Sequence, residues 1–212
     1  MKKLFAAAML AALIAGSAAS RAEEITRFKP LKAEELTPPQ KAYADLIATP
    51  PRNAKFGNPP YRAYIRNPEL APKLSALSEY LRWNTKLPAR LSEMAILITA
   101  REWTAQYEWF AHYPLALKGG LDPKVADAIA AGKRPDSMKD DEAALYDLAT
   151  ALYRDRKVSD AVYKAALEKF GESGIMDIIG IIGYYDLVSM TLITMQADAP
   201  NDSVKPLPVL TK

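Results

Sequence analysis

Hydrophobic residues recur at intervals of three and four along most of this chain, which is the period of a helix with one buried face. This pattern predicts helices over 68–84, 88–103, 105–118, 122–131, 139–155, 159–170 and 174–197. Pro38 opens a further short helix that extends to Ala48, because proline is tolerated in a first turn. No competing segment shows the two-residue alternation of a strand. The sequence therefore predicts an all-α fold.

Individual residues indicate where some of these helices begin, bend and end. Pro114 is expected to kink or shorten the helix at 105–118 just after His112, and Gly119 with Gly120 is expected to end it. Ser159 is expected to cap the start of a later helix.

The last helix, over 175–195, is apolar on nearly every face. Such a helix is buried in a core, buried between subunits or embedded in a membrane. Asp177 and Asp186 lie within it and argue against a membrane span. Because a single domain has difficulty covering a helix that is apolar all round, this segment favours a homo-oligomer.

The first residues resemble a targeting signal. Lys2 and Lys3 precede an apolar run over 4–15, and small residues lead to a boundary after Ala22. A membrane anchor is the alternative, but the run is too short to cross about 30 Å of hydrocarbon. We therefore expect a signal peptide over 1–22 and a periplasmic or secreted mature protein that has no membrane segment.

The rest of the chain divides into three parts. Residues 23–58 are expected to form an extended N-terminal arm with a short helix. The proline-rich segment 49–60, which overlaps the end of this arm, has the composition of a loop, and a loop of this length is expected to be functional or to bind a partner. Residues 59–198 are expected to form one helical domain. Residues 199–212 hold three prolines and form a tail that is either a loose end or an arm that wraps a neighbour.

Charge and cysteine content exclude several function classes. The chain has 28 basic and 25 acidic residues, and removal of 1–22 would take away three basic residues, which leaves equal numbers. A balanced mature chain gives no support for nucleic-acid binding. The chain has no cysteine, so it forms no disulfide and performs no thiol catalysis.

The best candidates for proton chemistry lie on two adjacent predicted helices. His112 is the only histidine, and Glu108 stands one helical turn before it on the same face, where a carboxylate can orient an imidazole. Glu93 precedes a run of apolar residues, so its helix is expected to be partly buried, and an apolar pocket would raise the pKa of its carboxyl.

Six short segments between about Pro59 and Asp198 carry a family resemblance. They are Asn-Pro-Glu-Leu at 67–70, Ser-Glu-Tyr-Leu-Arg at 78–82, Leu-Pro-Ala-Arg-Leu-Ser-Glu at 87–93, Tyr-Glu-Trp at 107–109 with His112, Val-Ser-Asp at 158–160 and Gly-Tyr-Tyr-Asp at 183–186. In this order and spacing the chain resembles the carboxymuconolactone decarboxylase and alkylhydroperoxidase-D-like family.

In the redox branch of that family, eleven residues separate a glutamate from a first cysteine, two residues separate this cysteine from a second one, and three residues separate the second cysteine from a histidine. This pattern places the glutamate on Glu93 and the histidine on His112, whereas the two thiol positions fall on Ala105 and Glu108. The chain is therefore similar to a cysteine-less branch of the family. The resemblance implies a single-domain helical bundle, assembly into trimers or hexamers, and chemistry without a cofactor or metal.

The resemblance also implies a reaction in which carbon dioxide leaves an unsaturated lactone. We therefore expect a cofactor-independent decarboxylase, lyase or isomerase that acts on a small oxo acid or lactone. Arg90 or Arg62 would hold the substrate carboxylate, Tyr107 or another hydroxyl would stabilise the enolate, and His112 with Glu108 or Glu93 would deliver the proton. Further candidates for the wall of the site are Tyr61, Tyr64, Trp109, Tyr184 and Tyr185.

Three other functions are weighed against this one. A non-catalytic periplasmic binding protein could reuse the same pocket for a small molecule. A peroxidase is disfavoured because it needs the missing thiols. A metal site at Glu93, Glu108 and His112 is disfavoured because one histidine without a thiol is a poor zinc ligand set.

Overall fold

The structure is a computed structural model that describes residues 27–209, and within that range it is all-helical with no strand. The helices are α1 (Pro38–Ile47), α2 (Tyr61–Tyr64), α3 (Ala71–Glu79), α4 (Ala89–Trp103), α5 (Gln106–Lys118), α6 (Pro123–Ala130), α7 (Asp140–Thr150) and α8 (Asp160–Thr194). Three single turns accompany them, the 3₁₀ turn η1 (Ala33–Glu35) and the π-helical turns η2 (Tyr80–Asn84) and η3 (Ala151–Asp155). The all-α prediction is confirmed; the predicted signal peptide lies outside the described residues.

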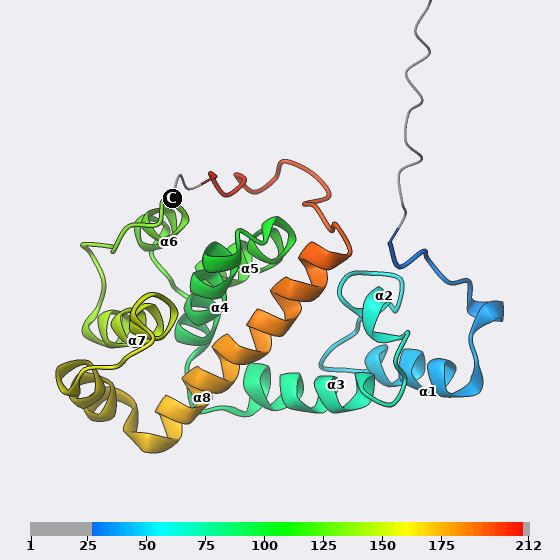
Figure 1. The fold of residues 1–212 in the computed structure, drawn as a ribbon, viewed down its shortest axis with the longest axis horizontal. Coiled ribbons are helices and arrows are strands. Elements are labelled where there is room, and N and C mark those ends of the chain that lie inside the picture. The colour runs from blue at the N-terminus through cyan, green and yellow to red at the C-terminus, as the bar shows by residue number, and fades with distance from the viewer. Residues whose placement is uncertain (1–26, 210–212) are drawn as a thin grey trace, which may run out of the picture.

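Helix α4 is the centre of the molecule. Every residue from Leu91 to Arg101 is buried, and the helix contacts α5, α6, α7 and α8. Figure 1 shows α8 running diagonally between the group α4–α7 and the N-terminal group α1–α3. The site described below lies where α4, α5 and α8 meet η2.

The helices predicted from periodicity are confirmed, and the differences have local causes. The segments 68–84 and 139–155 each finish in a π-helical turn, η2 and η3, rather than in regular helix. Pro114 does not shorten α5, which continues to Lys118. Ser159 caps α8 as predicted, because its hydroxyl accepts a hydrogen bond from the backbone N–H of Val162. The pattern missed α2 and η1, which are too short to show a period.

A glycine divides the last long helix into the two predicted ones. Gly171 has φ +65°, a left-handed conformation that favours glycine, so the helical path breaks between 160–170 and 172–194. The second part supplies core residues such as Ile178, Ile181 and Val188. Among the described residues α8 is the one helix with the length and apolar content to cross a membrane, but 56% of its apolar window is buried in the fold.

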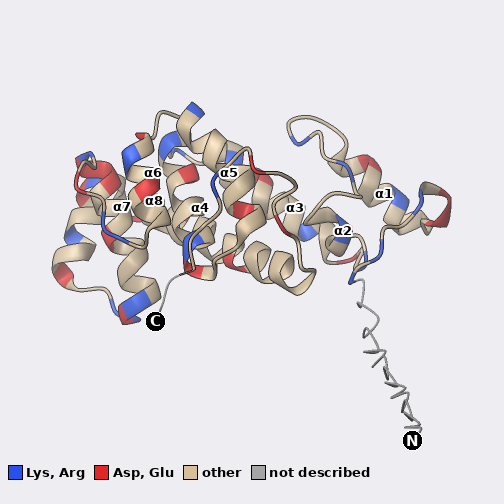
Figure 2. Cartoon of the chain, turned by 90° about the horizontal axis from the view of Figure 1, so that it is seen from above, with Lys and Arg blue, Asp and Glu red and all other residues tan. Residues whose placement is uncertain are grey.

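The C-terminal tail packs against its own chain as far as residue 209. Val204 and Leu207 are buried, and the side-chain amide of Gln106 both donates to the carbonyl and accepts from the N–H of Leu207. Arg101 donates to the carbonyl of Pro208. The described part of the tail is therefore not a loose end. In Figure 2 basic and acidic residues are interspersed over the helices and do not gather on one face of this view.

Candidate acid/base site

A tight connection between α4 and α5 brings the two predicted acid/base segments together. Thr104 takes a left-handed conformation with φ +51°, and the N–H of Ala105 donates back to the carbonyl of Ala100 at 2.8 Å. This hydrogen bond, together with that from the N–H of Thr104 to the carbonyl of Arg101, closes α4 as a Schellman motif, and the chain reverses within two residues. The second turn of α4 therefore lies against α5, and Glu93 meets His112 although they are 19 positions apart.

His112 lies between two carboxylates. Its Nδ1 is 2.5 Å from Oε2 of Glu93 in a buried hydrogen bond, and its Nε2 is 3.0 Å from Oε1 of Glu108. The second contact is an ion pair without good hydrogen-bond alignment, so Glu108 Oε1 is buried with no hydrogen-bond partner. Tyr185 of α8 packs at right angles to the imidazole, with ring centroids 5.1 Å apart.

These carboxylates determine the charge of the imidazole. Burial lowers the pKa of His112, but the negative charges of Glu108 and Glu93 and their contacts with the ring outweigh burial and raise it to about 9. His112 is therefore an imidazolium at neutral pH. Because both ring nitrogens face carboxylates, neither offers a lone pair to a metal. Residues 27–209 contain no group of three or more His, Asp or Glu side chains arranged to hold a metal ion.

A cavity of about 160 Å³ opens beside His112 and Glu108. It is lined by Arg52, Pro59, Pro60, Tyr61, Ser78, Arg82, Tyr107, Glu108, Ala111, His112, Tyr184, Tyr185 and Val188. The lining comes from the proline-rich loop, α2, α3, η2, α5 and α8, so residues far apart in the sequence form one small pocket.

Arg82 is the cation of this pocket that has unused hydrogen-bonding capacity. Its Nη2 is 3.8 Å from Oε1 of Glu93, and its guanidinium lies 5.0 Å from the ring centroid of Trp83. Burial lowers the pKa of Arg82, but Tyr185 and Glu93 outweigh burial, so the pKa is raised and the charge is kept. Its Nε is buried without a hydrogen-bond partner, and no other nitrogen of its guanidinium donates a hydrogen bond to the described residues, so N–H groups remain for an acceptor.

Arg52 holds the proline-rich loop over the same pocket. One of its amino groups donates to Ser78 Oγ at 2.8 Å and to the hydroxyl of Tyr61 at 3.3 Å, and the other donates to the carbonyl of Ser75 at 2.8 Å. Its guanidinium also lies 5.2 Å from the ring centroid of Trp83. Arg52 therefore anchors the loop to α3 and adds positive charge to the pocket wall.

The structure brings most of the predicted site residues to this pocket. His112, Glu108 and Glu93 form one contact chain, and Tyr61, Tyr107 and Tyr185 line the cavity. Arg90, Arg62, Tyr64 and Trp109 are not among the lining residues.

Each of the four residues outside the pocket has a different environment. Arg90 forms ion pairs with Asp141 at 2.6 Å and with Glu142. Trp109 faces the C-terminal tail and lies 5.6 Å from the ring of Tyr113. The remaining two residues are Tyr64, which is buried in the core, and Arg62, whose Nε is buried without a partner.

The sequence did not predict that Arg52, Ser78 and Arg82 line the pocket. Arg52 lies in the proline-rich loop, whose length suggested a function without indicating the residue. Arg82 and Ser78 lie in the segment 78–82 that carries part of the family resemblance. The resemblance is therefore the one feature of the sequence that could have indicated these two residues. Tyr184, in contrast, was a sequence candidate, and it lines the cavity beside Tyr185.

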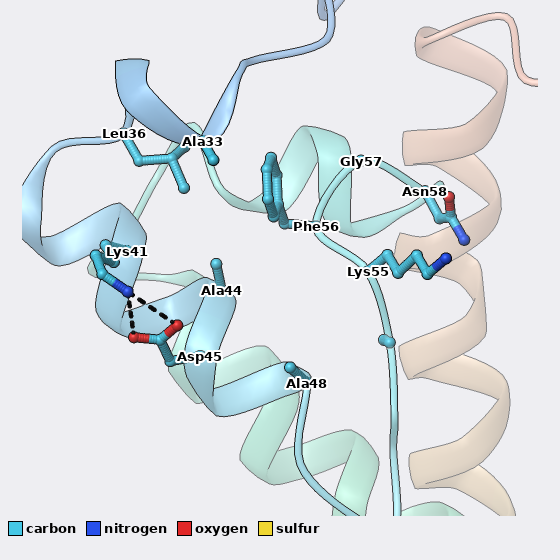
Figure 3. A pocket seen from close by; sticks show the side chains of 11 residues that line it. Ala33, Leu36, Lys41, Ala44, Asp45, Ala48, Lys55, Phe56, Gly57 and Asn58 are labelled. Carbon is cyan, nitrogen blue, oxygen red and sulfur yellow. Dashed lines mark hydrogen bonds and ion pairs between the residues drawn. The ribbon is translucent and has the colours of Figure 1, made fainter.

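A larger cavity, of about 590 Å³, lies elsewhere, between η1, α1 and the loop 54–58 (Figure 3). Its wall is mostly alanine, Leu36 and Phe56, and the paired charges of Lys41 and Asp45 stand at its side. It shares no residue with the His112 pocket, and no histidine lines it. The candidate acid/base residues therefore lie at the smaller pocket.

The all-helical architecture matches an AhpD-like helical fold. No protein-family model and no curated protein matches the sequence. Among solved structures, the chain is similar to a crystal structure from Agrobacterium tumefaciens, a protein of unknown function for which a role as the antioxidant defence protein AhpD has been suggested. The TM-score is 0.54 at 16% identity, over 64% of this chain and 94% of that one. This likeness shows the fold, not the reaction.

Proposed function

We propose that this protein is an exported, cofactor-independent acid/base enzyme that acts as a decarboxylase, lyase or isomerase on a small oxo acid or lactone. The observation that carries the proposal is the buried Glu93–His112–Glu108 chain beside a cavity with a cationic wall. Export is supported by the signal-like residues 1–22.

The contacts suggest how the proton would move. Glu108 lines the cavity, and its Oε1 forms the ion pair with His112, so its carboxylate would be the base that accepts the proton of an acidic C–H or O–H of a ligand. His112, an imidazolium, holds Glu108 from behind and would return a proton through Nε2. Glu93 keeps the imidazolium charged through Nδ1.

The arginines of the pocket would stabilise negative charge on the substrate. Arg82 keeps a buried, unpartnered N–H, and the partly committed Arg52 lies in the same wall. A carboxylate or a developing enolate oxygen would accept from Arg82, and the hydroxyls of Tyr61 and Tyr107 supply further donors. This assignment replaces Arg90, whose guanidinium is already paired with two carboxylates.

The size of the cavity limits the substrate. A volume of about 160 Å³ is close to that of a cavity that holds one benzene molecule, about 150 Å³. The substrate would therefore be one small ring or a short acyclic oxo acid. Thiol peroxidase chemistry is excluded, because the chain has no cysteine and the two thiol positions are Ala105 and Glu108.

The test is proton exchange. The mature protein is incubated in deuterium oxide with a panel of 2-oxo acids and five- and six-membered unsaturated lactones, and NMR follows exchange at the carbon next to the carbonyl and loss of carboxylate. Glu108→Gln should lower turnover about a hundredfold, whereas Glu102→Gln, which changes an exposed glutamate on α4, should leave it unchanged. A compound that binds and stabilises the protein but is recovered without exchange would refute the enzyme and support a binding protein.

A further inference from the structure

The C-terminal tail crosses the reversal between α4 and α5 and is hydrogen-bonded on both sides of it. On the α5 side, the side-chain amide of Gln106 donates to the carbonyl of Leu207 and accepts from its N–H, each at 2.9 Å. On the α4 side, Nη1 of Arg101 donates to the carbonyl of Pro208 at 2.7 Å. We call residues 203–209 the tail strap; Figure 1 shows the red tail passing from the end of α8 towards α6. The strap therefore joins the last turn of one helix to the first turn of the next.

The reversal is strained at its centre and depends on its contacts. Thr104 has φ +51°, a left-handed conformation that β-branched residues rarely adopt. Arg101 supports it, because its Nη2 donates to Thr104 Oγ1 at 2.6 Å, and its Nη1 also donates to the carbonyl of Ala130 at the end of α6 at 3.1 Å. Arg101 is 5% exposed, and burial lowers the pKa of its guanidinium. Its three acceptors are all uncharged oxygens, so the carbonyl from the strap is one of the few groups that satisfy this buried cation.

The strap is attached at a few points rather than packed along its whole length. Within it, Val204 and Leu207 are the buried residues. A cavity of about 450 Å³ separates much of the rest from α5 and α6, with Trp109 and Tyr113 on the helical side. Close-packed interiors hold few voids of this size. The strap can therefore be loosened without opening the core beneath α4.

A small tilt at the reversal is enough to separate the two acid/base residues that lie on different helices. His112 lies about 9 Å along the helix axis from Gln106, so a tilt of α5 by about 10° about its first turn moves the imidazole by about 1.6 Å. That displacement breaks the 2.5 Å contact between His112 Nδ1 and Glu93 Oε2. The contact of Nε2 with Glu108 does not change, because both residues belong to α5.

From these observations we infer that the tail strap is a positioning element of the acid/base site, which holds the reversal at Arg101 and Gln106 and so keeps His112 in contact with Glu93. The strap touches neither residue and acts through the orientation of α5. The inference rests on the proposed function in so far as it explains how the acid/base residues of that function are positioned. It is tested on the imidazole itself and not on turnover.

The experiment measures the pKa of the His112 ring by NMR titration of the whole chain. Gln106→Ala removes both hydrogen bonds to Leu207, and Leu207→Ala removes a buried anchor of the strap. Each should lower the ring pKa by about one unit, because one of the two carboxylates that raise it moves away. In a Glu93→Gln background the same two changes should have no further effect, since the contact through which they act is already lost.

The matched control is Gln40→Ala on α1. The side-chain amide of Gln40 likewise donates to a backbone carbonyl, that of Ile65 at 3.2 Å, and accepts from a backbone N–H, that of Thr37 at 3.0 Å. Its loss should leave the ring pKa unchanged, because these contacts are remote from the reversal.

Three results would overturn the inference. The first is a ring pKa that keeps its wild-type value in both strap variants. The second is an equally large fall in the Glu93→Gln background, which would show a general loosening of the fold. The third is loss of helical circular dichroism in both variants, which would make the strap part of the core. Absence of turnover on every compound, with the expected fall in ring pKa, would refute the proposed function and leave this inference standing.

Discussion

The charge of His112 gives the most direct test of the site, because it couples folding to pH. The pKa of His112 rises from its ordinary value of 6.5 to about 9 in the folded chain, with burial opposing the rise and Glu108 and Glu93 causing it. Since a tenfold change in proton affinity is worth about 1.4 kcal/mol, the folded chain binds this proton about 3 kcal/mol more tightly than the unfolded chain does.

The sign of the effect follows from the direction of the shift. A raised pKa means that the folded state holds the proton over a pH range in which the unfolded state has released it. The stabilisation is therefore fully present below pH 6.5 and disappears as the pH rises through about 9. From this group alone, we expect the free energy of unfolding to fall by about 3 kcal/mol between pH 6 and pH 10.

Two measurements check this expectation. The chain has one histidine, so its ring resonance in an NMR spectrum is assigned without ambiguity and should titrate near pH 9. Urea unfolding at a series of pH values gives the free energy, and His112→Gln serves as the control for other groups that titrate in this range. The stability difference between wild type and variant should shrink as the pH rises. A ring that titrates at or below pH 6.5, or a difference that does not change with pH, would refute the assigned charge.

Three further expectations concern function and stability. His112→Ala and Glu108→Gln should each lower turnover of an identified substrate about a hundredfold with the fold retained; wild-type turnover in both would place the site elsewhere, and unfolding of both would make the residues structural. Arg90→Met should lower the free energy of unfolding by about 3 kcal/mol, because it leaves the buried Glu142 without its cation. The same variant should keep kcat within a factor of about two. A stable but inactive variant would contradict both expectations. Chelators should not inhibit the enzyme, and elemental analysis should find no stoichiometric metal, whereas inhibition reversed by one ion would overturn the metal-free mechanism.

The sequence by itself determined the helical elements, because the residues that form and end a helix are close together in the sequence. The three- and four-residue period marked the long helices, and Gly171 and Ser159 specified a break and a cap through conformations that depend on a few neighbouring residues. The pairing of Glu108 with His112 was equally local, since residues four apart on one helix are always neighbours. The short helix α2 and the continuation of α5 past Pro114 were not predictable in this way.

Only the tertiary structure decided which charges meet. Arg90 and Arg82 look alike in the sequence, yet the first points to Asp141 on α7 and the second lies beside Glu93 at the pocket. Arg52 reaches the pocket only because the proline-rich loop folds back onto α3. The contact between Glu93 and His112 likewise requires α4 and α5 to pack together. Such long-range contacts depend on how whole helices bury their apolar faces, and the local pattern along the chain does not encode that arrangement.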